Sequence, residues 1–159
     1  MAVTELEYLR RAEGSREKLY RAAVMTLGSE AAAIDAVDEA VYRGYRKVHT
    51  LRKQEYLETW LMRILINVCR DELRRRRREL SVAELPETAQ AEFDALPLKE
   101  AIRRLPEALR QVIVLRFFSG FTLEETAAIL EIPRGTVATR QRRALAILRL
   151  ELSGEEEQP

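Results

Sequence analysis

The 159-residue chain has one cysteine, Cys69, and one histidine, His49. A single cysteine excludes a disulfide within the chain, and the two residues are too few for a zinc site built from cysteine and histidine. Glycine and proline are scarce, with six and five residues, and aromatic residues make up only 6%. So few chain breakers favour long helices over the short strands and frequent turns of a β protein.

Long apolar runs and catalytic motifs are also absent. The longest apolar run falls far short of the roughly 18 residues of a membrane span, and residues 1–7 lack the basic-then-apolar layout of a signal peptide. There is no glycine-rich phosphate loop and no serine or cysteine nucleophile in a recognisable setting. We therefore expect a cytoplasmic protein that has no enzymatic activity, no metal and no cofactor.

The residues that are abundant favour helix throughout. Hydrophobic residues reach 47% and charged residues 33%, with leucine, alanine, glutamate and arginine dominant, and no alternating β-branched run appears. The fold class we predict is all-α. The net charge of +1 hides a segregation of charge: residues 43–78 and 99–150 are basic, whereas residues 81–98 and 151–159 are acidic. Two basic blocks around an acidic strip indicate two nucleic-acid-facing modules and a linker.

Helical periodicity predicts seven helices in two modules. The first module covers 1–79 and the second 98–152, with a flexible acidic linker at 80–97 that contains Pro86 and Pro97, and a disordered tail at 153–159. Ser29 is the expected N-cap of the second helix, whose buried side chains would be Ile34, Val37, Val41 and Tyr45. The helices are expected at 4–27, with an interruption near Gly14, and at 30–48, 56–79, 98–104, 106–118, 123–130 and 133–152.

The helix over 56–79 has two distinct faces. An apolar stripe from Leu57 to Leu73 includes Trp60, which we expect in the core rather than as a base-stacking platform. A polar face carries Arg63, Asn67, Arg70 and Arg74, at helical spacing. The helix ends in the run Arg74–Arg78, and five adjacent like charges repel unless a polyanion lies beside them. This face predicts nucleic-acid binding, and a merely solvated surface is the alternative.

Residues 122–143 are typical of a helix-turn-helix, in which the second helix enters a DNA major groove. Thr122 and Glu125 form a capping box at the start of the first helix. Glu131 and Ile132 make the turn, and Pro133 stands where a new helix begins. The second helix then supplies hydrogen-bond donors for phosphates and base edges, with an ordinary helical hairpin as the alternative.

The order of these motifs resembles bacterial extracytoplasmic-function sigma factors, from about residue 15 to residue 152. The resemblance in the first module rests on Leu19-Tyr-Arg, Leu27-Gly28, Asp35-Ala-Val-Asp-Glu39, Thr59-Trp-Leu-Met-Arg-Ile64, Asn67 and the arginine run. In the second module it rests on Leu105-Pro106, Val112-Ile-Val-Leu-Arg116, Gly120-Phe-Thr-Leu-Glu-Glu125, Ile132-Pro-Arg-Gly-Thr-Val137 and Arg140.

The resemblance implies a sigma factor with a region-2 domain, a region-4 domain and no region 3, which directs promoter-specific initiation by RNA polymerase. Its partners would be core polymerase, through the β′ clamp coiled coil and the β flap, promoter DNA and an anti-sigma factor, which could hold it at the inner face of the membrane. The implied clamp contacts are Asp35, Asp38, Glu39, Tyr42 and Arg43.

Recognition and melting of the −10 element would use the loop Thr50, Leu51, Arg52, Lys53 and Gln54 and the helix face Arg63, Asn67, Arg70 and Arg74. The −35 element would contact Arg134, Thr136, Val137, Thr139, Arg140 and Arg143. The family opens DNA by trapping an unstacked base in a protein pocket, which offsets the cost of unstacking. The linker would follow the RNA exit path, where its acidity resembles nucleic acid.

The chain departs from the family pattern at single positions. Asp38 stands where glutamine is usual, Ile34 where an acid is common, and Val41 where phenylalanine is common. Glu131 replaces a usual glycine in the turn, and Ala138 a usual lysine. Two other functions stay open: a stand-alone helix-turn-helix regulator of duplex DNA, and a helical scaffold for protein binding.

Overall fold

The computed structural model describes the backbone of residues 3–80 and 97–156, and both ranges are helical with no strand. This confirms the all-α prediction. The expected linker lies almost wholly outside the described residues. The helices, with the single-turn segments labelled η, are α1 (Glu5–Leu27), α2 (Glu30–Lys47), η1 (Val48–Thr50), η2 (Gln54–Tyr56), α3 (Leu57–Leu80), α4 (Pro97–Arg104), α5 (Glu107–Ile113), η3 (Val114–Phe118), α6 (Leu123–Leu130) and α7 (Arg134–Glu156).

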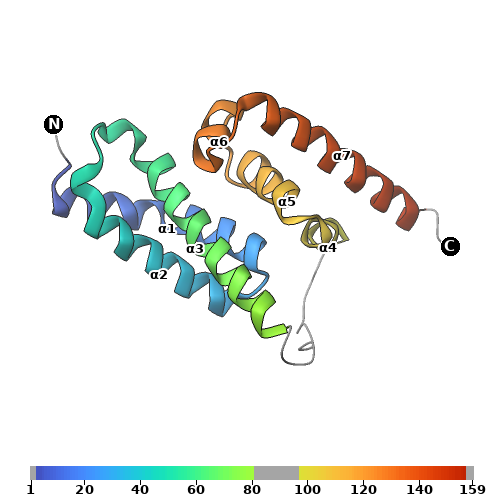
Figure 1. Cartoon of the computed structure of the whole chain (residues 1–159), viewed down its shortest axis with the longest axis horizontal. Coiled ribbons are helices and arrows are strands. Elements are labelled where there is room, and N and C mark those ends of the chain that lie inside the picture. Colours follow the sequence, from blue (N-terminus) through green and yellow to red (C-terminus); the bar gives the residue numbers. More distant parts are fainter. Residues whose placement is uncertain (1–2, 81–96, 157–159) are drawn as a thin grey trace.

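The first module is a bundle of α1, α2 and α3 (Figure 1). Local capping sets both ends of α1 and the start of α2. Thr4 and Ser29 accept hydrogen bonds from backbone amides in the first turns of α1 and α2, which satisfies donors that a helix start leaves open. Gly28 ends α1 with a φ of 70°, a left-handed conformation that suits glycine. Gly14 is tolerated inside α1, so the expected interruption is wrong.

Helix α2 packs closely against α1 because its inner face consists of small residues. Ala33, Ala36, Val37, Ala40 and Gly44 are its buried side. A Cβ at Gly44 would collide with the Tyr8 hydroxyl, which donates a 2.7 Å hydrogen bond to the Val41 carbonyl. The expected burial of Val37 is confirmed.

Ile34 and Tyr45 were wrongly assigned to the core. Their side chains are 49% and 37% exposed. The packing face of α2 is rotated away from them, toward the alanines, because only small residues allow the close approach to α1.

The second module contains α4 to α7, with α6, the turn and α7 forming the helix-turn-helix. The capping box is confirmed, since Thr122 accepts from the Glu125 amide and the Glu125 carboxylate accepts from the Thr122 amide. Pro133 precedes α7 rather than opening it. Between α5 and α6, η3 is a π-helical turn in which the Ser119 amide bonds the Val114 carbonyl five residues back, a feature that the periodicity did not predict.

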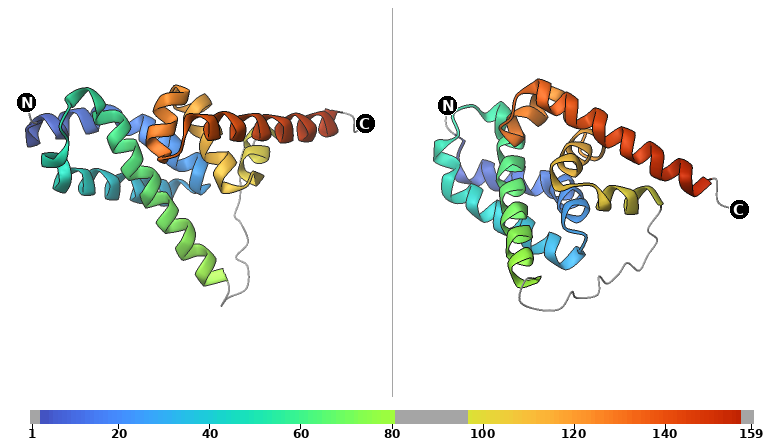
Figure 2. Two further views of the ribbon diagram at one scale, coloured as in Figure 1. Left: turned by 45° about the horizontal axis from the view of Figure 1, so that its top comes forward. Right: turned by 45° about the vertical axis from the view of Figure 1, so that its right-hand side comes forward.

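The two modules contact each other. Helix α6 packs on α3, and η3 lies against α1 (Figure 2). Helix α3 is therefore covered on two sides, which explains why Met62, Ile66 and Cys69 are buried in addition to the predicted apolar stripe. Trp60 is partly buried against the core and lies edge-on to Tyr8, with ring centroids 6.4 Å apart.

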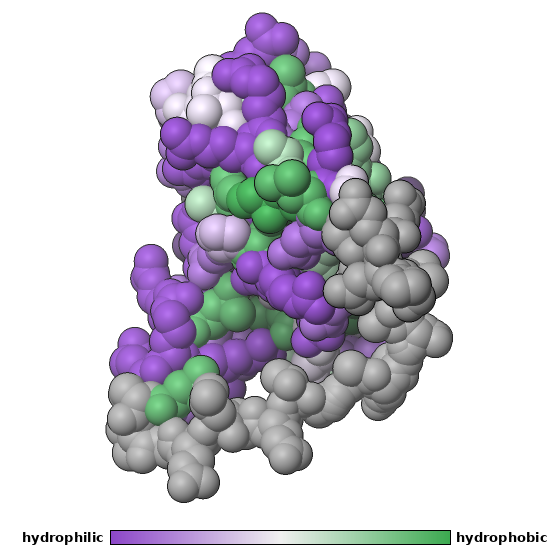
Figure 3. Space-filling model, turned by 90° about the vertical axis from the view of Figure 1, so that its right-hand side faces the viewer, coloured by the Kyte–Doolittle hydropathy of each residue, from purple (hydrophilic) through white to green (hydrophobic). Residues whose placement is uncertain are grey.

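The C-terminal helix is longer than expected. It continues to Glu156, past Leu152, so the tail prediction is wrong for 153–156, and 157–159 lie outside the described residues. The surface beside α4 and the end of α7 is mostly hydrophilic, with hydrophobic side chains gathered near its centre (Figure 3). In the described ranges, no helix is both long and apolar enough to cross a membrane.

Candidate nucleic-acid interface

The polar face of α3 is accessible along most of its length. Asn67 and Arg74 are exposed and Arg70 is half-buried, while the opposite side of α3 packs into the core with Leu61, Leu65 and Val68. The amphipathic pattern predicted this division, because one side of a helix is buried and the other stays in water. The exposed face presents amide and guanidinium donors, the groups that bind phosphates and base edges.

The loop before α3 surrounds an open hollow of about 540 Å³, lined by Arg11, Arg52, Lys53, Gln54 and Glu55. Arg11 comes from α1, and its Nη1 donates a 2.9 Å hydrogen bond to the Gln54 carbonyl. Sequence reasoning missed Arg11, because no local pattern links α1 to a loop more than forty residues away. A guanidinium has five N–H donors, so Arg11 can hold the loop and still bind a ligand.

Two of the predicted loop residues have other roles in the structure. Leu51 is only 7% exposed and packs in the core, so it does not line the hollow. Thr50 is exposed, and its hydroxyl donates to the Lys47 carbonyl at 2.7 Å. The accessible cations of the loop are therefore Arg52 and Lys53.

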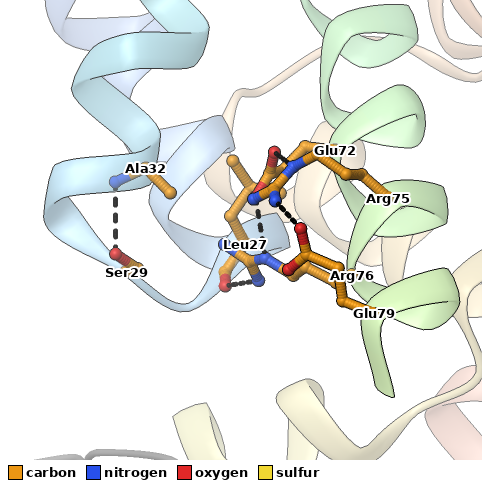
Figure 4. A network of polar contacts seen from close by, with 7 residues as sticks. All are labelled: Leu27, Ser29, Ala32, Glu72, Arg75, Arg76 and Glu79. Atoms are coloured by element: carbon orange, nitrogen blue, oxygen red, sulfur yellow. Dashed lines mark hydrogen bonds and ion pairs between the residues drawn. The ribbon is translucent and has the colours of Figure 1, made fainter. Parts of the chain in front are cut away.

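Arginines in the run at the end of α3 have partners within the chain. Arg75 contacts Glu72 and Glu79, and Arg76 contacts Glu72 and the Leu27 carbonyl at the end of α1 (Figure 4). The Arg75 guanidinium holds the pKa of the Glu72 carboxyl below its usual range. Arg77 pairs with Glu107 of α5 at 3.1 Å. Internal carboxylates thus relieve part of the repulsion for which we invoked a polyanion.

The second helix of the helix-turn-helix presents its cations outward. Arg134 and Arg143 are exposed, and Thr136, Thr139 and Arg140 are half-buried. Val137 is fully buried and packs in the core, so the structure places it away from any DNA-facing surface. Arg134 lies 3.6 Å from Glu124 of α6, an exposed pair that adds little stability.

The outer side of α2 holds the predicted clamp contacts together. Asp35, Asp38, Glu39 and Tyr42 are exposed and Arg43 is half-buried. Asp38 pairs with Arg16 of α1 at 3.0 Å, and Arg43 pairs with Glu39 at 2.8 Å. These hydrogen bonds raise the pKa of both arginines. Ile34 adds an exposed apolar group to the same helix.

Arg63, unlike the rest of the α3 face, is engaged with the second module. Its Nη2 donates to the Ala128 carbonyl at 3.0 Å, and its Nε lies 3.6 Å from a Glu131 carboxylate oxygen. Asn67, Arg70 and Arg74 therefore remain the accessible part of the predicted −10 face of α3, whereas Arg63 touches the end of α6 and the turn of the helix-turn-helix.

No metal-binding cluster occurs among the described residues. Cys69 is buried, and burial raises the pKa of its thiol to about 12, so it stays protonated and unreactive at neutral pH. It packs as a small apolar residue, as its place beside the apolar stripe of α3 predicts.

Two known domain families match the chain, one in each module. Residues 13–79 match Sigma-70 region 2, and residues 101–150 match Sigma-70, region 4. Arg11 lies outside both matched ranges. The matches include α2, the loop, α3 and the helix-turn-helix, which are the elements that carry the sites described above.

Curated relatives show the same similarity over two thirds or more of their length. The chain is 30% identical over 146 residues to RNA polymerase sigma factor SigV of Bacillus subtilis, covering 89% of this chain and 88% of that protein. It is 32% identical over 130 residues to the ECF RNA polymerase sigma-E factor of Escherichia coli K12, covering 69% and 68%.

Solved structures show a similar arrangement of helices. The sigma factor RpoE in its complex with the anti-sigma factor NepR, from Bartonella quintana, superposes with a TM-score of 0.78 at 25% identity, over 92% of this chain and 97% of that one. CnrH in complex with the cytosolic domain of CnrY superposes with a TM-score of 0.72 at 23% identity, over 95% and 90%, which shows a shared fold.

Proposed function

The chain belongs to the extracytoplasmic-function group of sigma-70 family RNA polymerase sigma factors, and from this premise we propose which of its surfaces serves each step of promoter-specific initiation. The region-2 domain covers residues 1–79 and the region-4 domain 98–152, with 80–97 as the linker. The observation that carries the proposal is the presence, in one chain, of an exposed donor face on α3 and a helix-turn-helix with a basic second helix.

The −10 element binds at α3 and the preceding loop. Asn67, Arg70 and Arg74 contact the strand along the helix, and an unstacked base enters the hollow beside Arg11 and Arg52. The cost of unstacking one base, a few kcal/mol, is offset by contacts in the hollow. The size and the polar lining of this hollow support its assignment.

The −35 element binds at α7. Arg134, Thr136 and Thr139 lie near the start of the helix, where a recognition helix contacts bases and phosphates, and Arg140 and Arg143 follow one to two turns later. With Val137 in the core, these five residues are the proposed contact set.

Core polymerase binds the outer face of α2, through its β′ clamp coiled coil, and the second module, through its β flap. An anti-sigma factor limits this binding. The similarity to a sigma factor solved with its anti-sigma factor supports that assignment. We assign the protein to the cytoplasm, where core polymerase and promoter DNA are found, and we assign it no catalytic activity.

The test is in vitro transcription with purified core polymerase on a pooled promoter library, with and without the protein. We expect new start sites that share two upstream motifs at a fixed spacing. A folded protein that gives no new start sites but binds a palindromic duplex without polymerase would instead be a stand-alone regulator.

A further inference from the structure

The second turn of α1 contacts the loop that precedes α3. The Arg11 guanidinium donates a 2.9 Å hydrogen bond from Nη1 to the Gln54 carbonyl, and the start of α1 lies next to this loop (Figure 1). Arg11 is half-buried, which restricts the conformations that its long side chain can adopt. The region-2 match begins at residue 13 and assigns no role to this contact.

The loop is fixed at its two ends. At the first end, Leu51 is 7% exposed, and its amide donates to the carbonyl three residues back at 3.0 Å. At the second end, the Gln54 carbonyl accepts the hydrogen bond from Arg11. Exposed Arg52 and Lys53 lie between these ends and line the hollow. The place of their side chains therefore depends on both anchors.

The Arg11 contact differs from the backbone hydrogen bonds of the same segment, which are local. The Tyr56 amide, for example, donates to the Lys53 carbonyl at 3.1 Å. A local bond shapes a turn but does not set where the turn lies in the domain. Helix α1 is itself held against α2, since the Tyr8 hydroxyl donates to the Val41 carbonyl at 2.7 Å. Arg11 therefore ties the loop to a packed core.

The hollow is open and lined by charges of both signs, with Glu55 beside the cations. Cations near a strand of nucleic acid attract its phosphates whatever the base, whereas a base edge is read by groups held at fixed places. A hydrogen bond that fixes the loop backbone thus serves base reading more than general attraction.

We propose that Arg11 is a positioning residue for the −10 element: by holding the Gln54 carbonyl it sets the shape of the hollow and so determines which unstacked base the hollow accepts. This inference rests on the proposed function. A pocket that reads a flipped base depends on contacts to the edge of that base. When one wall of the pocket shifts, binding of the preferred base weakens more than binding of the others.

The test is transcription by the holoenzyme, reconstituted from core polymerase and the full-length chain, on a library with randomised −10 and −35 elements. At each position, the ratio of transcripts from the preferred base to those from the other bases measures discrimination. Arg11→Ala should lower this ratio roughly three- to tenfold at one position of the −10 element, the effect of losing one hydrogen bond. The ratios in the −35 element should stay the same.

Two further variants separate position from charge. Arg11→Lys keeps the positive charge, but its ammonium lies one bond short of Nη1. It should therefore lower the same −10 ratio, and it carries the test if Arg11→Ala fails to fold. Since the number of cations is unchanged, the salt dependence of promoter binding should match the wild type. Arg10→Ala removes a charge from the exposed neighbouring position and should leave every ratio unchanged.

Unchanged −10 discrimination in the folded Arg11 variants would overturn the inference. So would a loss of transcription that is equal for all bases, because Arg11 would then act through its charge alone, or an equal effect of Arg10→Ala. A wild-type holoenzyme that gives no new start sites would refute the proposed function and this inference with it. Start sites with −10 discrimination that the Arg11 variants retain would refute this inference alone.

Discussion

Tyr42 and Tyr56 are two exposed tyrosines of the first module with different proposed roles. Their side chains are 55% and 54% exposed, and each lies beside a cation, Arg46 at 5.7 Å and Lys53 at 5.8 Å. Only Tyr42 is on the proposed polymerase-binding face of α2. We predict that Tyr42→Ala weakens core binding by about five- to thirtyfold, as expected for an interface aromatic, whereas Tyr56→Ala leaves core binding unchanged. Equal losses in a fluorescence titration would contradict the α2 interface.

Arg140 is one of the α7 residues that the resemblance assigns to the −35 element. A bidentate arginine contact with guanine provides roughly 1–3 kcal/mol of discrimination, or about 5- to 150-fold. We predict that Arg140→Ala reduces −35-dependent transcription within that range and leaves core binding unchanged. Exposed Arg149 of the same helix provides the control, and Arg149→Ala should transcribe normally. Loss of core binding in the Arg140 variant would refute the assignment.

Tyr8 gives the fold a pH dependence at high pH. Burial raises the pKa of its hydroxyl to about 12 from an ordinary 10, because the ionised form would be desolvated. The folded chain therefore keeps a proton that the unfolded chain loses between pH 10 and 12. The contribution of Tyr8 to the free energy of unfolding is therefore complete below pH 10. It falls by about 2–3 kcal/mol as the pH rises through 12.

Chemical denaturation at pH 9 and pH 11.5 tests this prediction for Tyr8. The free energy of unfolding should fall less for Tyr8→Phe than for the wild type, whereas Tyr56→Phe, at an exposed position, should behave as wild type. The other groups that titrate are common to all three proteins and cancel in the comparison. Parallel curves for wild type and Tyr8→Phe would contradict the shift.

At the scale of elements, the capping box shows how a few local residues fix the start of a helix. Thr122 and Glu125 bond each other's amides at 3.1 and 2.9 Å. We predict that Thr122→Ala lowers the free energy of unfolding by about 1 kcal/mol, measured by urea denaturation followed by circular dichroism. Thr122→Ser keeps the hydroxyl and should retain most of the stability. A neutral Thr122→Ala would mean that α6 is held by packing alone.

The elements that the sequence predicted well are those whose signals are local. Ser29, Gly28 and the capping box mark helix ends within a few residues, and the amphipathic pattern of α3 marks its buried stripe. Tertiary packing determines which of the remaining side chains are buried. Val137 and Leu51 are buried because α7 and the loop turn them toward the core, and Ile34 is exposed because small alanines form the contact with α1.

The contact between modules could not be predicted for a related reason. Arg63 and Glu131 are far apart in sequence, and each fits a local role, one on a polar helix face and one in a turn. Glu131 was identified as a departure from the family, but its partner became evident only in the folded chain. The place of Arg11 beside the loop could not be predicted for the same reason, since its hydrogen bond to Gln54 joins α1 to a loop that is distant in sequence.

At the scale of the whole molecule, initiation requires two modules to act at distant DNA sites. Joining two modules raises the effective concentration of the second at its site once the first is bound. This advantage exists only if the tether can span the sites. Residues 81–96 separate the described ranges, and sixteen residues reach at most about 55 Å, so the tether and the modules together must cover the promoter.

Tether length therefore sets a limit that can be measured. We predict that deleting residues 88–95, which halves the maximal reach to roughly 27 Å, lowers transcription at least tenfold, while binding of a −10 single strand by the free chain is unchanged. Replacing the same eight residues by glycine and serine keeps the length and removes the acids, so it should restore most of the activity. If this replacement is as inactive as the deletion, the acidic composition of the segment is what matters, and the argument from reach is wrong.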